Sequence, residues 1–575
     1  MSSSPDGVSR RAFLRDSVVI GACAASALTL GAETARPPAK GAGVSLPEGL
    51  PGMPARVFVQ HDADLVEASR DGRRFTTSMA SVELAGSEVR VECPSGGLAR
   101  VVLRWRVAWP TGARFLGDHW ERGYGDFLWR PMEPSRVMPW YFAATCAPGG
   151  RTFMAGVATQ PSTLCFWTAD AEGVSLWLDF RNGGSPCLMG DREIIAARIV
   201  SSCSAQGESP MAALRRFCRA LCPAPRLPAG PVCGNNNWYY AYGRDFDAGA
   251  MRRDAAFLAE IAQGQATRPF CVIDAGWTPG SSCPGGPWKE GDPGRFPDMP
   301  GLAADMRRLG VRPGIWMRPT ALTTVDLPSR LRSGPVTAPE RALDLTIPDN
   351  LELIRGDVAR VRSWGYELIK HDFSTFDALG RWGFEMGAEV TDGGWHLADR
   401  SLTNAEVILR LYRTLRSAAG DAVLLGCNTM GHLGAGLFEV QRTGDDTSGL
   451  VWERTRRMGV NTLAYRMPQN GTFFVCDADC AAHTARTPWE LDRQYLDLVA
   501  RSGTALFVSV DPRTVTPDKK KVFRAAMQTA LSGGPPGGCE PLDWLDMATP
   551  RTWRIGGRTV GYSWEEASGA WPFSV

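Results

Sequence analysis

The sequence is poor in the residues and runs that several protein classes require. Only six histidines are spread over 575 residues, which leaves little material for a metal centre. No stretch approaches the roughly 20 consecutive apolar residues that a membrane-spanning helix needs. The 63 basic and 61 acidic residues leave a net charge of +2, so the overall charge offers no attraction for nucleic acid. We therefore expect no metal ion, no organic cofactor, no nucleic-acid partner and no membrane span.

Two common catalytic patterns are also missing. The chain shows no Ser-His-Asp order and no glycine-rich phosphate loop opening a helix. What it does have is ordinary globular composition, with 44% apolar and 22% charged residues. Tryptophan (20) is twice as common as tyrosine (10). A flat indole suits the face of a sugar ring, although it fills protein cores equally well.

The first 35 residues resemble a twin-arginine export signal. Arg10 and Arg11 precede a short apolar run, Val18–Leu30, and Ala32 and Ala35 offer small residues for cleavage. We expect an exported protein that works in the periplasm or outside the cell. That destination permits disulfides.

The remaining chain shows two different patterns of predicted secondary structure. Residues 45–205 carry short alternating strands punctuated by Gly and Pro, which is typical of a β-sandwich. Residues 206–231 are expected to form a helix (Pro210–Leu221) and a Pro-rich linker. Residues 232–535 alternate apolar strands with amphipathic helices, which predicts an α/β domain with a (β/α)8 TIM barrel. Residues 536–575 leave room only for a short β extension.

Eight barrel strands are expected. They lie near Cys233–Asn237, Phe270–Asp274, Arg312–Met317, Leu368–Asp372, Val423–Gly426, Val440–Arg442, Phe473–Cys476 and Ala505–Val508. In such a barrel the carboxyl ends of the strands converge on one face, where active sites form. The residues expected at these ends include Trp238, Asp274, Trp277, Trp316, Lys370, Asp372, Cys427, Arg442, Asp445, Asp446, Asp477 and Asp479. Carboxylates among aromatic side chains suit the cleavage of glycosidic bonds, in which one carboxylate attacks or stabilises the anomeric carbon and another protonates the leaving oxygen.

Several segments are similar, in a consistent order, to melibiase-type alpha-galactosidases of glycoside hydrolase family 36, clan D. The matching segments are Asp118–Gly125, Asn235–Trp238, Cys271–Trp277, Trp288–Pro297, Leu309–Trp316, Leu368–Asp372 (ending K-x-D), Arg442–Thr447 (R-x-G-x-D-T) and Asp477–Asp479. The resemblance implies that Asp372 is the nucleophile of a retaining glycosidase and Asp446 its acid/base, with Asp445 as the alternative. It also implies that Asp274, Lys370 and Arg442 hold the hydroxyls of a terminal sugar. Family members often assemble through their β domains, so a homo-oligomer is possible.

Other candidates for substrate contact have a structural alternative. Trp238, Trp277 and Trp316 suit either a sugar platform or the core, and Cys427 suits either ligand contact or packing. Asp477 and Asp479 are expected to fix a loop, stapled by the flanking Cys476 and Cys480.

Three departures from the family pattern concern the substrate. Ala275 stands where the family has a second aspartate, Arg318 replaces an acid, and His371 replaces an aromatic residue. An oligosaccharide or polysaccharide ending in an alpha-galactoside is the first expectation for the substrate. The alternatives are a β-L-arabinopyranosidase, an α-N-acetylgalactosaminidase, a transglycosylase and, from another class, a carbohydrate-binding pseudoenzyme.

Overall fold

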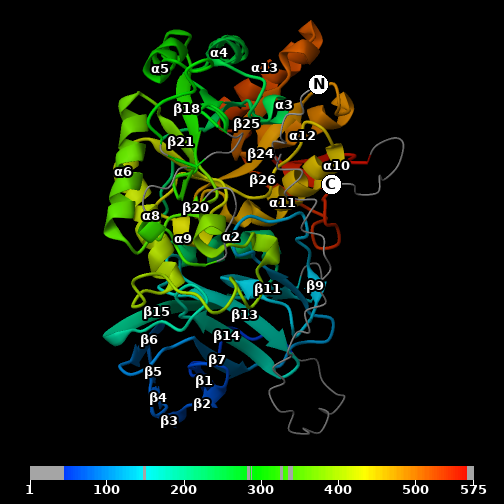
Figure 1. Ribbon diagram of the computed structural model, residues 1–575. Coiled ribbons are helices and arrows are strands. Elements are labelled where there is room, and N and C mark those ends of the chain that lie inside the picture. Colours follow the sequence, from blue (N-terminus) through cyan, green and yellow to red (C-terminus); the bar gives the residue numbers. More distant parts are fainter. Residues whose placement is uncertain are drawn as a thin grey trace, which may run out of the picture.

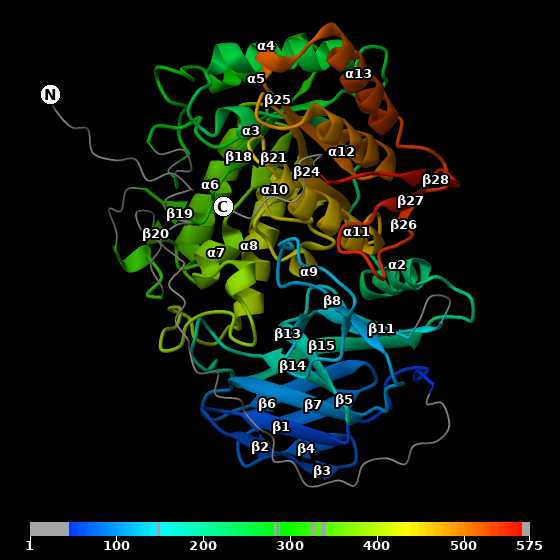
Figure 2. The same ribbon diagram turned by 90° about the vertical axis from the view of Figure 1, so that its right-hand side faces the viewer.

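The computed structural model describes residues 45–565 except 147–149, 281–284, 287, 324–327 and 335–340. The expected export signal, residues 1–35, lies outside the described residues. An N-terminal domain of β-sheets forms one end of the molecule, and an α/β barrel forms the other (Figures 1 and 2).

The N-terminal domain consists of two antiparallel sheets. The first has the order β10-β13-β14-β7-β1-β2, with β1 Arg56–Gln60, β2 Leu65–Glu67, β7 Arg100–Arg106, β10 Met138–Pro139, β13 Leu164–Asp170 and β14 Gly173–Asp179. The second has the order β3-β4-β5-β6-β15-β12-β11-β8-β9, with β3 Ser69–Asp71, β4 Arg74–Thr76, β5 Ser81–Ala85, β6 Glu88–Cys93, β8 Arg114–Gly117, β9 Arg130–Pro131, β11 Tyr141–Thr145, β12 Thr152–Val157 and β15 Gly190–Cys203. Buried and partly exposed residues alternate along β5 and β6, because only one face of this sheet packs on the core.

The barrel is closed by eight parallel strands. In order around the barrel they are β16 Cys233–Asn236, β17 Phe270–Ile273, β18 Arg312–Met317, β21 Leu368–His371, β22 Val423–Gly426, β23 Val440–Arg442, β24 Val475–His483 and β25 Ala505–Val510. Strands such as β17 and β22 are buried along their whole length, which is why they are continuous apolar runs in the sequence. The predicted fold class is confirmed.

Helices surround the barrel and connect its strands. They are α2 Pro210–Leu221, α3 Trp238–Ala241, α4 Ala248–Ile261, α5 Met299–Arg308, α6 Pro348–Ser363, α7 Ser374–Leu379, α8 Asn404–Ala419, α9 Gly431–Gly434, α10 Trp452–Thr455, α11 Thr462–Arg466, α12 Trp489–Ser502 and α13 Pro517–Leu531. Side-chain caps mark several of their starts. Thr403 and Glu406 form a capping box at α8, and Asp247 accepts a hydrogen bond from Ala250 N at α4. None of the described helices has the length and apolar character to cross a bilayer.

Three smaller strands follow the barrel, β26 Cys539–Pro541, β27 Thr552–Ile555 and β28 Arg558–Gly561, and form one antiparallel sheet. A further short pair, β19 Ala321–Leu322 and β20 Arg341–Ala342, lies in the loop after β18.

Strand β24 differs from its prediction. It begins at Val475 and runs to His483, and its pairing with β25 slips between Asp477 and Cys480, where Asp479 has a φ of 69°. Asp477 and Asp479 therefore lie in an irregularity within the strand. The expected staple between Cys476 and Cys480 is wrong, since both thiols are free.

One segment of the N-terminal domain reaches into the barrel. We call residues 118–127, between β8 and β9, the arm; in Figure 2 this stretch rises from the β domain toward the barrel strands. Gly123 N donates to Thr443 O (2.8 Å) and Asp445 N donates to Gly123 O (2.9 Å), which gives a parallel bridge beside the end of β23. The arm thereby becomes part of the barrel's carboxyl face.

Candidate active site

The floor of the site is an ion pair that connects two barrel strands. Lys370, in β21, donates from Nζ to Asp274 Oδ2 (2.7 Å) beyond the end of β17, and Asn236 Nδ2 donates to the same oxygen (2.5 Å). Burial lowers the pKa of Lys370, but the Asp274 carboxylate more than offsets it, so the pKa ends above its usual range. The pair therefore places a lysine cation and a carboxylate within one buried polar cluster.

Asp372 follows β21 and is held by three N–H donors. Trp316 Nε1 donates to Oδ2 (3.1 Å), while Phe373 N (2.8 Å) and Asn428 N (3.1 Å) donate to Oδ1. Hydrogen bonds of this kind stabilise the ionised carboxylate. Phe373 has a φ of 62°, which is the left-handed region that a bulky residue rarely adopts. This backbone strain is located at the residue that supplies one of the three donors, as is common at functional sites.

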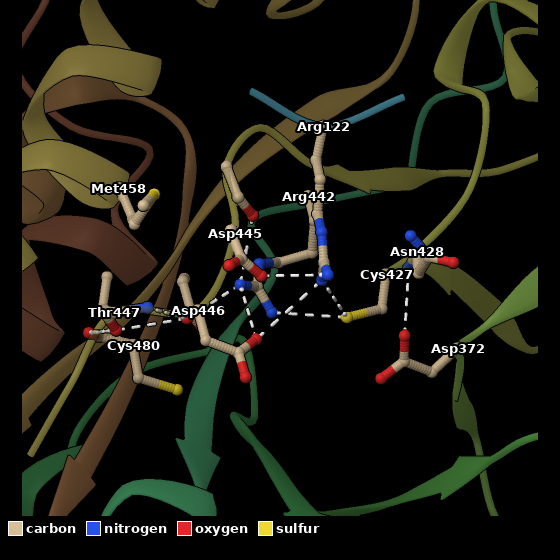
Figure 3. A network of polar contacts seen from close by, with 12 residues as sticks. Arg122, Asp372, Cys427, Asn428, Arg442, Asp445, Asp446, Thr447, Met458 and Cys480 are labelled. Atoms are coloured by element: carbon tan, nitrogen blue, oxygen red, sulfur yellow. Dashed lines mark hydrogen bonds and ion pairs between the residues drawn. The ribbon is translucent and has the colours of Figure 1, made fainter. Parts of the chain in front are cut away.

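Arg442 organises the opposite wall. Its guanidinium contacts Asp479 Oδ2 (2.8 Å), Cys427 Sγ (3.4 Å) and Asp446 Oδ1 (3.4 Å). Asp479 also accepts hydrogen bonds from Thr447, through both its backbone N–H and its hydroxyl. Figure 3 shows that Asp446 and Asp372 lie on either side of Cys427 in one polar network. The structure thus brings both predicted carboxylates to the same face of the barrel.

Asp445 lies beside Asp446 but has its own partners. Its carboxylate contacts Arg122 of the arm (2.9 Å) and Arg454 of α10 (2.6 Å). Burial raises the pKa of Asp445, but the two arginines outweigh that effect and leave the pKa below its usual value. Figure 3 shows Asp445 in contact with Arg122, which enters from the N-terminal domain.

Arg122 is the main residue that the sequence analysis missed. The signal was the Asp118–Gly125 segment, which resembles the family but carried no residue role. The side chain of Arg122 is 3% exposed and lies over the rings of Tyr124 (5.9 Å) and Trp382 (5.5 Å). The neighbouring Glu121 is buried too and accepts a hydrogen bond from the Asn428 side chain.

The tryptophans take different positions. Trp316 contacts Asp372, as described above. Trp277 is fully buried, donates to Trp316 O (2.9 Å) and has its ring against Trp288 and against Trp364 at the end of α6. Trp277 therefore contacts both Trp316 and Trp364, which ends α6, and its contact with a sugar stays a prediction. Trp238 begins α3, is 5% exposed and contacts the edge of Tyr242.

Asp477 lies below this network. Burial raises its pKa to about 6, and the charge of Arg442 opposes that rise. One of its oxygens accepts a hydrogen bond from Asp479 N (2.9 Å). Asp477 therefore shapes the strand irregularity that presents Asp479 to Arg442, in keeping with its expected fixing role.

The three departures from the family pattern all lie in the buried part of the barrel. Ala275 is 1% exposed. Arg318 is committed to Asp377 through Nη2 (2.6 Å) and Nε (3.0 Å). His371 packs against Phe438 (4.7 Å) and burial lowers its pKa to about 3, so it is neutral. The side chains that replace the acid and the aromatic residue thus have structural partners of their own.

The Arg318–Asp377 pair gives a stability prediction. The two side chains are 4% and 0% exposed, and Thr320 also donates to Asp377. Arg318→Ala leaves a buried carboxylate without its cation, which we expect to cost about 3–5 kcal/mol and to lower the melting temperature accordingly. Thermal denaturation followed by circular dichroism measures this. Lys521→Ala, which removes an ion pair that is exposed on both sides, is the control. Equal melting temperatures for the two variants contradict the prediction.

By sequence, the chain matches no protein-family model and no curated protein. By structure, it is similar to an alpha-galactosidase from Thermus thermophilus in complex with p-nitrophenyl alpha-D-galactopyranoside, with a TM-score of 0.57 and 20% identity over 88% of this chain and 99% of the other. A GH36 alpha-galactosidase from Geobacillus stearothermophilus in complex with 1-deoxygalactonojirimycin gives 0.55 and 15% over 89% and 76%. The alpha-galactosidase from Lactobacillus brevis gives 0.52 and 14% over 84% and 69%. At this level of identity the likeness establishes the fold, which is that of GH36 alpha-galactosidases.

Proposed function

We propose that this chain is a retaining exo-glycosidase that removes terminal alpha-galactoside-like residues from oligosaccharides or polysaccharides. The observation that carries the proposal is the environment of Asp372. A carboxylate held by three N–H donors at a barrel strand end is positioned to attack, and Asp446 lies in the same network. The solved structures of the same fold are alpha-galactosidases, including one in complex with stachyose, which supports this class of substrate.

Each residue has a separate role in the proposed double displacement. Asp372 attacks the anomeric carbon while Asp446 protonates the leaving oxygen, which forms a glycosyl-enzyme ester on Asp372. Asp446 then takes a proton from water, which attacks the same carbon and releases the sugar. In this proposal Asp274, Lys370 and Arg442 bind hydroxyls of the terminal sugar, and Cys427, which contacts Arg442, and Trp316, which contacts Asp372, contribute further substrate contacts.

The setting of the reaction is part of the proposal. We propose export by the twin-arginine route, on the sequence of residues 1–35, and therefore a periplasmic or extracellular enzyme. We also propose that copies of the chain can associate, on the family resemblance alone.

A panel of nitrophenyl glycosides tests the function. The wild type should hydrolyse at least one alpha-glycoside with retention of configuration, which proton NMR of the first-formed sugar detects. Hydrolysis with inversion rejects the double displacement, and binding of sugars without any turnover favours the carbohydrate-binding pseudoenzyme.

Ala275 favours a second candidate within the same chemistry. In the resembled family this position carries a carboxylate that faces the outer hydroxyls of the sugar. Without it, a buried galactoside hydroxyl that lacks another partner loses about 1–3 kcal/mol. A β-L-arabinopyranosidase or another enzyme for a sugar that lacks or modifies this group loses less, and an α-N-acetylgalactosaminidase or a transglycosylase uses the same two carboxylates.

We expect Ala275→Asp to shift relative kcat/KM toward galactosides by roughly tenfold or more, the kinetic equivalent of about 1.4 kcal/mol. The measurement compares kcat/KM for nitrophenyl alpha-galactoside and nitrophenyl β-L-arabinopyranoside in both proteins. Ala275→Asn is the matched control, because it adds similar volume without a charge. If the wild type already prefers the galactoside strongly and neither substitution alters the ratio, position 275 does not contact the sugar.

A further inference from the structure

Asp445 and Asp446 are adjacent carboxylates in one buried polar cluster, and the proposed reaction assigns a role to only one of them. Their exposed fractions are similar, 18% and 15%. What differs is their set of partners. Two carboxylates that interact at close range do not ionise independently, because the charge of one disfavours the charge of the other.

The neighbouring arginines lie at different distances from Asp445 and Asp446. Arg122 lies 2.9 Å from Asp445 but 3.9 Å from Asp446, and Arg454 contacts Asp445 at 2.6 Å. Arg442 lies 3.4 Å from Asp446, but 2.8 Å from Asp479. Arg122 and Arg442 therefore each have a carboxylate closer than Asp446.

The charged and titratable groups that interact with Asp446 come from several elements of the fold. They are Arg122 on the arm, Tyr239 on α3, Arg442 at the end of β23, Asp445 in the following loop and Arg454 on α10, while Asp479 on β24 shares the Arg442 guanidinium. The nearest full negative charge in sequence is Asp445, and its two ion pairs keep it ionised.

We propose that Asp445, fixed in its ionised form by Arg122 of the N-terminal domain and Arg454, is a positioning residue that holds a proton on Asp446 in the resting enzyme. The inference rests on the proposed function and deepens it. A general acid must carry its proton at the working pH, and the two carboxylates divide the roles by environment, one permanently charged and one titrating. After Asp446 gives its proton to the leaving oxygen, the same neighbouring charge makes it a stronger base toward water.

The arm makes this arrangement depend on both domains. Its bridge between Gly123 and Gly444 sets the backbone of Arg122 next to that of Asp445. The Tyr124 and Trp382 rings lie against the guanidinium, which limits its movement. The N-terminal domain thus contributes a charge to the active site.

Asp445→Asn tests the proposal through the pH profile. The substitution keeps the shape and removes the charge, so Asp446 should lose its proton at lower pH, and the alkaline limb of kcat/KM for a glycoside with a poor leaving group should move down by about one pH unit or more. Asp445→Glu retains the charge and should restore the limb. Asp492→Asn, which alters a buried carboxylate paired with His483 outside the site, should leave it unchanged. An unchanged alkaline limb in Asp445→Asn overturns the proposal.

Two further readouts separate this proposal from its alternatives. If Asp445 is itself the acid, Asp445→Asn loses turnover of glycosides with poor leaving groups at every pH. The alkaline limb of its kcat/KM profile is then not displaced. Infrared spectroscopy follows the proton without any turnover: the band of a protonated carboxyl group that Asp446→Asn removes should titrate at lower pH in Asp445→Asn. If the wild type is inactive on all glycosides, the proposed function is rejected. The infrared titration of the Asp446 carboxyl group still tests whether Asp445 holds the proton on Asp446. A band that titrates identically in both proteins overturns this inference.

Discussion

Asp372→Ala should reduce turnover of every glycoside by on the order of 10⁴-fold or more, because no glycosyl-enzyme ester can form without the carboxylate. The loss should be the same for good and poor leaving groups, since the nucleophile is needed whatever departs. Initial rates on a nitrophenyl glycoside and on an unactivated disaccharide measure this. Asp497→Ala, which removes a partly exposed aspartate of α12, is the control and should retain full activity.

The covalent intermediate offers a second measurement. A fluorinated glycoside that slows the second step should add its mass to the wild-type protein, and peptide mapping should place the adduct on Asp372. Asp372→Ala should accumulate none. Residual turnover above about one percent of wild type, or an adduct on another carboxylate such as Asp477, contradicts the assignment.

Asp446→Ala should show a dependence on the leaving group that Asp372→Ala lacks. Turnover of unactivated glycosides should fall by about 10²–10⁴-fold, because the leaving oxygen then departs without a proton. A dinitrophenyl glycoside needs little protonation, so formation of the glycosyl-enzyme should fall far less. Azide, which attacks without base catalysis, should restore turnover and release a glycosyl azide.

Asp445 provides the matched comparison for this experiment. It neighbours Asp446 in sequence and is similarly exposed, but its carboxylate is held by Arg122 and Arg454. If Asp445→Ala gives the dependence on leaving group and the rescue by azide, while Asp446→Ala loses all substrates equally, the acid/base is Asp445. If both variants behave alike, the two carboxylates act as one unit and no single acid/base can be assigned.

The barrel could be predicted because its strands are buried on both faces. A strand such as Phe270–Ile273 leaves an unbroken apolar run, and the polar residue after it marks the strand end. Because strand ends meet at the carboxyl face of a barrel, the same pattern predicted that Asp372 and Arg442 lie on that face. The prediction of the strand end failed at β24. There the strand continues beyond Asp477 and Asp479 after a shift in its pairing register with β25. No local pattern in the sequence distinguishes such an irregularity from a strand end.

The sequence alone could not predict the position of residues that depends on packing between segments far apart in the chain. Arg122 lies 305 positions before Cys427, which it approaches in the site, and no periodicity connects them. Trp277 was equally ambiguous, because an indole after a barrel strand can turn inward or toward the helices. Its ring contacts with Trp288 and Trp364 come from segments that follow it at some distance along the chain, and no local pattern indicates them.

The bridge between Gly123 and Gly444 also has a consequence for the order of assembly. The N-terminal domain leaves the ribosome first, but Arg122 and Gly123 of its arm lack their partners in the barrel until β23 has formed. The arginine and the carboxylate that it pairs with thus meet at a late stage of folding, after a long loop has been ordered. A barrel produced without residues 45–205 lacks this arginine and leaves the partly buried carboxylate of Asp445 with one cation instead of two. If the chain leaves the cytoplasm already folded, as the proposed export route requires, its two domains are docked and its active site is complete before it crosses the membrane.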